Sequence, residues 1–549
     1  MATYRTPGVY VEEISTLPPS VAEVATAVPA FIGYTEAGRK IARVTSMLEF
    51  EASFGKAKPT AFIASTVRNA ATGLDELYEI KPQTTGANPD FLLYYAISHY
   101  FKNGGGPCYI VSVGDYSKPV AKAAFLDGLT LIVKEDEPTL IVLTDAVLLK
   151  PADYMEVAQE ALAQCDLLTD RFVILDVPGG DVDGFRNGIG TNYLSYAAAY
   201  HPYLETTLTF AYDEAGVQVQ PGTVRSEGAF PAAGKGVRAA FTGVASPAPS
   251  VTIQDGDADL AKAVTFVIAA GNATLTIGNT KGRTGTQVAD AWSAWIKNNR
   301  TEGFEVAVEG DGTAVMAAAS AKALQAVPVT KTMLTDLKTT QTALYNSIKD
   351  KMSSQRVTLP PSAAIAGIYA QVDRDRGVWK APANVSVCAV VGPTVRITDA
   401  DQEGLNVDPT AGKSINVIRA FNGMGTKVWG ARTLAGNDNE WRYVSVRRLF
   451  ITIEESTKKA SAFAVFEPND ASTWLKVKGM IESYLFELWQ KGALAGSTAD
   501  AAYYVSVGLG KTMTSQDVLE GRMIVDIGVA AVRPAEFIVL RFTHKLQES

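Results

Sequence analysis

The sequence predicts a mixed α/β protein of several domains, with an extended strand-forming arm at each end of the chain. Between residues 89 and 178, helical and strand-like hydrophobic patterns alternate, which is typical of an α/β layer with a partly parallel sheet. Residues 206–330 instead carry short strand runs among Gly, Ala, Thr and Asp. β-rich runs also stand at both ends of the chain. Its 549 residues are enough for about two to four domains.

These patterns divide the chain into six parts. They are an N-terminal arm (1–24), an α/β domain (25–205), an inserted β-rich domain (206–330), a helical connection (331–358), an α/β C-terminal core (359–531) and a C-terminal strand arm (532–549). The first part is interpreted as an arm because it is punctuated by proline and holds few core-type residues outside the run VYVEEI.

The first α/β domain shows a helix, a glycine stop and a strand over 89–115. The run of three glycines follows the helical pattern directly, where a helix C-terminus favours glycine. A strand at 139–146, a helix at 152–165 and a strand at 171–178 continue the alternation. This order supports one layered domain.

The inserted domain is expected to be mostly β, with one helix at 286–299. That helix contains Trp292 and Trp295, which we interpret as core anchors of a small domain rather than as a ligand platform.

The C-terminal core returns to an α/β pattern. We expect its strands and helices in the following places: strands at 385–392, 426–434 and 442–456, helices near 455–465 and at 471–493, and strands at 502–510 and 522–532.

Both ends of the chain are predicted strands. The residues assigned to the N-terminal strand are Val9, Tyr10, Val11 and Ile14, and those assigned to the C-terminal strand are Phe537, Ile538, Val539, Leu540 and Phe542. Pro7 and Pro18 would bound the N-terminal strand, because proline cannot continue a ladder. Termini fray unless something holds them. The end strands therefore pair either with their own subunit, as ordinary edge strands, or with another molecule.

Composition excludes several classes of protein. A net charge of −8 argues against a dedicated nucleic-acid binder. The longest apolar stretches, such as 385–391, are far shorter than the roughly 18 residues that span a bilayer, and residues 1–8 resemble no secretory signal. We therefore expect synthesis and folding in the cytoplasm. Cys108, Cys165 and Cys388 are too few for a disulfide framework, and Cys108 and Cys388 are expected to be small buried residues.

No motif predicts catalysis, a cofactor or a metal. His99, His201 and His544 lack partners at metal-ligand spacing, and His99 is expected to be a structural histidine in a helix. Phosphate-loop resemblances at 508–514 and 411–414 fail because valine replaces the first glycine of the motif. Two Asp-rich stretches, at 255–260 and 373–377, do not follow the calcium-loop pattern. We therefore expect no enzyme, no cofactor and no metal site.

The residues resemble the contractile tail sheath proteins of phages and phage-tail-like injection systems. TPGVYVEEI is followed by VPAFIGYTEAG near the start of the chain. Further matching blocks occur in the order that the family shows: LPPSAAIAGIYAQVDRDRGVWKAPAN, INVIRAF, VWGARTL, WRYVSVRRL, FEPND, GALAG and PAEFIVLRF. The resemblance is specific over 1–40 and 359–545, and it is absent over about 206–330.

The resemblance implies a mechanical role. Such subunits stack as hexameric rings around an inner tube, above a baseplate and below a terminal cap, in a metastable extended state. On triggering, the sheath contracts and drives the tube through a target envelope. Terminal arms insert strands into the sheets of neighbouring subunits. The implied partners are therefore further copies of this chain, the inner tube protein, and baseplate and cap proteins, with no nucleic acid and no membrane insertion. Assembly is expected in the bacterial cytoplasm, and the product is a phage tail or a released particle.

Two further expectations follow from the resemblance. The 359–531 core would face the inner tube, where Lys458, Lys459, Lys476 and Lys478 could contact an acidic surface, unless they form an ordinary solvated helix face. The 206–330 insert would project outward. A surface- or glycan-binding module, suggested by this β-rich insert, is the alternative function, and an α/β enzyme is suggested only by analogy of fold.

Overall fold

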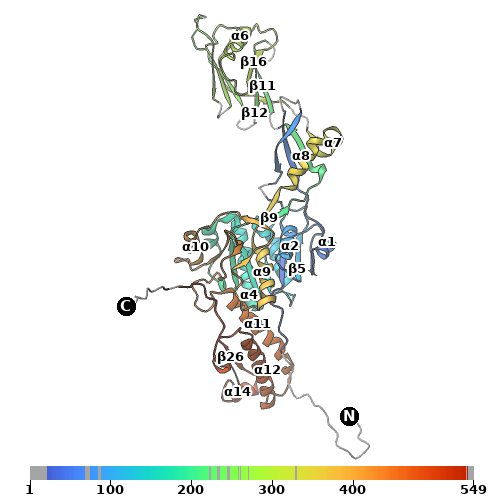
Figure 1. Ribbon diagram of the computed structural model, residues 1–549, viewed down its shortest axis with the longest axis vertical. Helices are drawn as coiled ribbons and strands as arrows, with labels where there is room; N and C mark the ends of the chain where they lie inside the picture. The colour runs from blue at the N-terminus through green and yellow to red at the C-terminus, as the bar shows by residue number, and fades with distance from the viewer. Residues whose placement is uncertain are drawn as a thin grey trace, which may run out of the picture. The chain divides into compact units, whose positions relative to one another are not determined.

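The computed structural model (Figure 1) describes residues 21–541 except 69–73, 85–87, 222–223, 232–234, 244–247, 258, 260, 270, 272, 328–330 and 540. The chain forms two compact units. Unit 1 comprises 1–58, 89–208 and 356–549, and unit 2 comprises 59–88 and 209–355. The predicted boundary after residue 205 lies close to this division, but unit 2 also takes in 59–88 and extends through 331–355.

A nine-stranded sheet is the centre of unit 1. Its order is β2 (Lys40–Val44), β5 (Cys108–Gly114), β1 (Pro29–Tyr34), β6 (Leu140–Val142), β7 (Phe172–Asp176), β8 (Ala197–His201), β23 (Ile415–Phe421), β24 (Gly425–Val428) and β21 (Val385–Ser386). From β5 to β23 the neighbours run parallel, whereas β2, β24 and β21 pair antiparallel. Strands β1, β6, β7 and β8 are fully buried, as expected for parallel strands covered on both faces. The mixed α/β fold is confirmed.

Helices pack around this sheet. They are α1 (Met47–Phe54), α2 (Leu93–Lys102), α3 (Lys122–Ile132), α4 (Pro151–Leu168), α5 (Val182–Gly188), α9 (Ser362–Arg376) and α10 (Asp399–Asn406). The predicted helix, glycine stop and strand over 89–115 correspond to α2 and β5. A separate small sheet joins β20 (Arg356–Leu359), β9 (Leu204–Thr209) and β22 (Val390–Pro393).

Two buried aspartates fix helix starts at the end of parallel strands. The Asp145 carboxylate accepts hydrogen bonds from the backbone N–H groups of Leu92 and Leu93, at 2.5 and 3.2 Å, where α2 begins. Asp176 accepts from the backbone N–H and the hydroxyl of Ser362, at 2.8 and 2.6 Å, where α9 begins. Each carboxylate satisfies N–H groups that a helix start leaves unpaired. Burial nevertheless raises the pKa of Asp145 to about 6 and that of Asp176 to about 7.

The C-terminal part of unit 1 is a helical body with a small sheet. Its elements are α11 (Val444–Ala460), α12 (Ala471–Gln490), α13 (Ala499–Ala502), β25 (Tyr503–Val507), α14 (Ser515–Leu519) and β26 (Val525–Val529). The strand predicted at 442–456 is wrong, because this segment is most of helix α11. Leu449 and Ile453 pack with α12, whereas Val444 and Ile451 pack on the cluster of the central sheet. Helix α11 is rich in β-branched residues, which favour strands, and this composition misled the prediction.

Unit 2 contains three four-stranded sheets. They are β19 (Thr332–Met333), β10 (Val217–Pro221), β3 (Phe62–Arg68) and β4 (Asp75–Pro82); β16 (Phe304–Val308), β12 (Val237–Gly243), β11 (Val224–Phe230) and β18 (Gln325–Ala326); and β14 (Thr265–Ala269), β15 (Thr274–Gly278), β13 (Ser250–Ile253) and β17 (Ala319–Ala323). Helices α6 (Gly285–Trp295), α7 (Leu334–Thr340) and α8 (Thr342–Ser353) accompany them. Trp292 is buried and stacks on Trp295, with Phe266 against both rings, so the core role of these tryptophans is confirmed.

Candidate assembly interface

The two-stranded sheet of β25 and β26 is the smallest sheet among the described residues of unit 1. The strands pair antiparallel from Tyr503 opposite Val529 to Val507 opposite Val525. One face packs on the α12 cluster through Val505, Val525 and Ile527. Each strand has one long edge with no partner strand among the described residues. Two strands alone are marginal, and an unpaired edge offers backbone groups to an added strand.

The start of the described chain lies against this same helical body. Val21 packs on the α12 cluster, and the Val24 amide donates to the Ser456 hydroxyl at 3.2 Å. The Thr26 carbonyl then accepts from the Arg448 guanidinium at 2.8 Å and from the Thr139 hydroxyl at 2.9 Å. We call residues 24–28 the N-terminal root. The predicted strand residues Val9, Tyr10, Val11 and Ile14 lie outside the described residues.

Arg448 makes the N-terminal root part of the core. Its guanidinium forms a two-point ion pair with Asp373 at 3.0 and 2.5 Å, and both side chains are almost fully buried. It also lies 4.6 Å from the centre of the Tyr369 ring. A guanidinium with this many partners is rigidly placed, because its planar donors match the carboxylate geometry.

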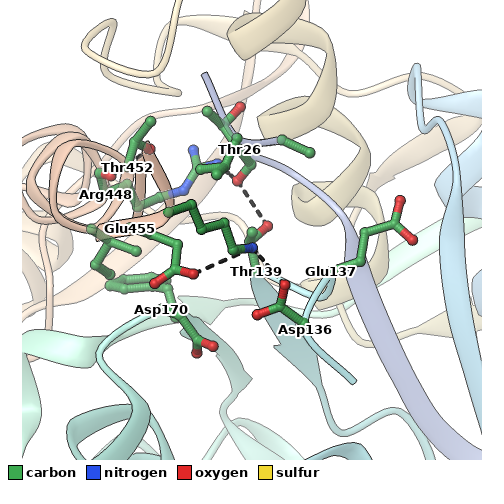
Figure 2. Close-up of a pocket in the computed structure, with 13 residues that line it drawn as sticks. Thr26, Asp136, Glu137, Thr139, Asp170, Arg448, Thr452 and Glu455 are labelled. Carbon is green, nitrogen blue, oxygen red and sulfur yellow. Dashed lines mark hydrogen bonds and ion pairs between the residues drawn. The ribbon is translucent and has the colours of Figure 1, made fainter. Parts of the chain in front are cut away.

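A cavity of about 230 Å³ lies beside the N-terminal root, lined by that root, by the loops that precede β6 and β7, and by α11 (Figure 2). The Lys459 ammonium is 2.7 Å from Asp136 and 3.3 Å from Glu455. Asp136 precedes the strand β6 and Glu455 lies on α11, so Lys459 links the sheet body to the helical body. The charge of this lysine is therefore already paired within the subunit.

The other predicted tube-contact lysines have different surroundings. Lys458, on α11, is 68% exposed and lies 3.1 Å from Glu455. Lys476 and Lys478 lie on α12, where Lys476 is exposed and Lys478 pairs with Glu482 at 3.4 Å. Because both are exposed and Lys459 is paired with two carboxylates, Lys458 and Lys476 are better placed than Lys459 to contact another molecule.

At the other end of the chain, Glu536 is held in a small polar cluster. Its carboxylate receives hydrogen bonds from Arg432 at 2.9 and 2.5 Å and from the Asn406 amide at 2.8 Å. The Tyr443 hydroxyl lies 3.3 Å away. We call these four residues the C-terminal clamp. It borders a groove of about 730 Å³ that the segment 534–538 also lines.

The predicted C-terminal strand residues follow this clamp directly. Phe537, Ile538 and Val539 belong to no helix or strand and are 71%, 79% and 77% exposed. Leu540 and Phe542 lie outside the described residues. Three consecutive large apolar side chains in water are unusual and point to burial against a partner.

The remaining sequence expectations have mixed outcomes. His99 is buried in α2 and its Nε2 lies 3.0 Å from the Cys388 carbonyl, which confirms a structural role, and burial lowers its pKa to about 4. Cys108 is buried as expected, but Cys388 is exposed, because strand pairing breaks between β21 and β22.

In the described part of the chain, no three His, Cys, Asp or Glu side chains gather as metal ligands. No described helix has both the length and the apolar character needed to cross a bilayer.

Sequence reasoning missed the residues that hold the two arm roots. Thr139, Arg432 and Arg448 meet partners more than 100 residues away in the chain, so no local pattern marks them. The sequence held one weak signal of the C-terminal clamp. Glu536 is a lone acid beside an apolar run, a place where an acid often has a partner within the same subunit.

Comparisons with known proteins agree on one family. The model of the phage tail sheath C-terminal domain matches residues 436–545. A protein of Pseudomonas aeruginosa (strain UCBPP-PA14) described as a prophage major tail sheath protein is 26% identical over 140 residues. That match covers 25% of this chain and 34% of the relative, so it spans about a third of the relative's length.

Solved structures match over nearly the whole chain. The helical sheath of the anti-feeding prophage in its contracted state is 27% identical, with a TM-score of 0.57, over 99% of this chain and 100% of that one. The PVC sheath complex of an extracellular contractile injection system, also contracted, is 25% identical, with a TM-score of 0.55, over 100% and 99%. The resemblance to contractile tail sheath proteins is confirmed.

Proposed function

We propose that this chain, which resembles contractile tail sheath proteins along its whole length, is a structural subunit of a contractile sheath. Two observations carry the proposal together. The structure is similar to a solved contractile sheath protein over 99% of the chain, and an apolar C-terminal segment is exposed in the single subunit, where a neighbouring subunit could cover it. The relatives are structural proteins, and we assign no catalytic role.

Strand addition is the proposed link between subunits. Residues 537–542 of one copy would pair with an outer edge of β25 or β26 in another copy, and residues 9–14 of a third copy would pair with the opposite edge. A two-stranded sheet would thereby become a four-stranded sheet built from three chains. Such a contact is heterologous, so it propagates rather than closing on itself.

The finer features of the function follow from the resemblance. We propose stacked hexameric rings around an inner tube, contact with baseplate and cap proteins, and assembly in the bacterial cytoplasm. The extended lattice would be a kinetic trap and the contracted lattice would bury more contact area. Rigid subunits that turn about the arms linking them fit the known repertoire of large transitions.

The glycan-binding alternative rests on the β-rich character of the insert, and the two tryptophans of the insert do not add to it. Trp292 is buried in the core of its domain and Trp295 packs against Phe266, so neither ring forms an open stacking platform.

Electron microscopy of the purified protein tests the proposal. The full chain should form hollow tubes, and deletion of residues 1–16 should leave a folded monomer that forms none. A monodisperse particle from the full chain under all assembly conditions would contradict the sheath function. Normal tubes from the truncated chain would contradict the role of the N-terminal arm alone.

A further inference from the structure

The C-terminal clamp differs from an ordinary surface ion pair. The Arg432 side chain is 5% exposed and the Glu536 side chain 22% exposed, so the guanidinium is shielded from water and the carboxylate is only partly open to it. Burial by itself would raise the pKa of Glu536. Hydrogen bonds from Arg432 and Asn406, with the positive charge of Arg432, instead hold this pKa below its usual value. The carboxylate therefore stays ionised and paired at neutral pH.

Arg432 is itself bound to the central sheet. Its backbone N–H donates to the Asn416 side chain at 2.7 Å, and that same side chain donates to the Arg432 carbonyl at 2.7 Å. Asn416 is a buried residue of β23 and also donates to the Ala199 carbonyl of β8, at 3.2 Å. A chain of hydrogen bonds thus runs from Glu536 to the parallel sheet.

The clamp lies directly before the exposed apolar residues of the C-terminal segment. The last described strand, β26, ends at Val529, and the following residues to 539 lie in no helix or strand; among them, Phe537, Ile538 and Val539 are large, apolar and exposed. The last residue with several strong side-chain contacts therefore stands immediately before the apolar segment that would reach another subunit.

We propose that the C-terminal clamp positions the C-terminal arm: Glu536 bound to Arg432 fixes the point where the exposed residues 537–539 leave the subunit and passes tension on the arm to the central sheet. This inference rests on the proposed strand exchange. Glu536 acts here as a positioning residue, because it touches its own subunit and not the neighbouring sheet.

The test compares Glu536→Ala and Glu536→Gln with a control, Glu467→Gln. Glu467 is exposed and has no ion pair among the described residues, so the control removes the same charge without touching the clamp. The full-length protein, kept dilute enough to be monomeric by light scattering, is treated with chymotrypsin. Mass spectrometry then follows cleavage after Phe537.

Loss of a hydrogen bond to a charged group should speed this cleavage about tenfold in Glu536→Ala, and less in Glu536→Gln. The control should match the wild type. Equal cleavage rates in all four proteins would overturn the positioning role. Glu536→Gln keeps the shape of the side chain, so it still decides the question if Glu536→Ala fails to fold.

The second readout is the mechanical strength of assembled tubes under shear, measured by the length distribution in micrographs. Glu536→Ala tubes should break into shorter pieces than control tubes. If Glu536→Ala tubes are as long as control tubes while the monomer is cleaved faster, the clamp positions the arm but does not transmit tension to the sheet. If the wild type forms no tubes, the sheath function fails, but the cleavage result still decides the positioning role.

Discussion

The Arg448 guanidinium donates a hydrogen bond to the Thr26 carbonyl at 2.8 Å, although 422 residues separate them in the chain. This contact ties the first described segment to helix α11. The C-terminal clamp ties the last described segment to Arg432, sixteen positions before Arg448 in the sequence. Both arms are therefore rooted at buried arginines within one short stretch of the C-terminal core.

The Thr139 hydroxyl offers a direct test of the N-terminal root. It donates to the Thr26 carbonyl and accepts from the Val28 amide at 3.0 Å. Thr139→Val keeps the shape but removes both bonds, and should lower the free energy of unfolding by about 1–2 kcal/mol. Urea denaturation measures this loss. Thr130→Val, at an exposed position of α3, is the matched control and should change stability by less than about 0.5 kcal/mol.

A proline in the C-terminal arm should separate folding from assembly. Ile538 is exposed and lies in no strand of the single subunit, so Ile538→Pro should leave the unfolding transition unchanged. Proline lacks the N–H that a β ladder needs, so the same change should abolish or strongly reduce tube formation.

Ile538→Thr is the control for this substitution, because threonine keeps a backbone donor and a strand preference. Its tubes should form almost normally. Tubes of normal yield from Ile538→Pro would show that this residue joins no inter-subunit ladder.

Asp176 should make unit 1 less stable as pH rises from about 4 to about 7. Burial raises its pKa from 3.8 to about 7, so the folded chain holds this proton more tightly than the unfolded chain does. The contribution of Asp176 to stability should therefore be largest below about pH 4 and should decline as pH rises to about 7.

Asp176→Asn removes this titration and keeps an oxygen that can accept from the Ser362 amide. The stability of the wild type minus that of the variant should fall between pH 4 and pH 7, as measured by urea midpoints in matched buffers. A difference that stays constant or grows over this range would contradict the raised pKa.

The predicted tube contacts can be sorted by the ion pairs seen within the subunit. Lys459 is paired with Asp136 and Glu455, whereas Lys476 is exposed. Lys476→Gln should weaken the association of sheath with inner tube and reduce its salt dependence. Lys459→Gln should leave tube association unchanged and cost less than about 1 kcal/mol of stability, because that pair is partly exposed. Co-sedimentation at low and high salt measures this association. If both substitutions weaken it equally, the proposed difference between Lys476 and Lys459 is wrong.

Local signals predicted the parts of the fold whose packing is one-sided or fully buried. Helix α2, the following glycines and β5 form a helix, stop and strand that sequence periodicity identifies directly. The same reasoning failed for α11, which packs on two clusters and is rich in β-branched residues. It also missed the parallel pairing of β3 with β10, because the two strands are about 150 residues apart in the chain.

The candidate interface was predictable only in its outline. Consecutive apolar residues at 537–539 identified a segment that needs a partner. Its anchor could not be found in this way, since Arg432 and Glu536 are 104 positions apart and each resembles an ordinary surface charge. The exposed Cys388 was missed for a related reason: an apolar run does not reveal where strand pairing is interrupted.

The division of the chain has a practical consequence for engineering. Thr26, Arg432, Arg448 and Glu536 all belong to unit 1, while the three small sheets of unit 2 contain none of these anchors. Foreign peptides or whole reporter domains inserted into the hairpin turns of unit 2 would leave the anchors intact. Under the proposed sheath function, such insertions would be displayed at regular intervals without changing these four residues.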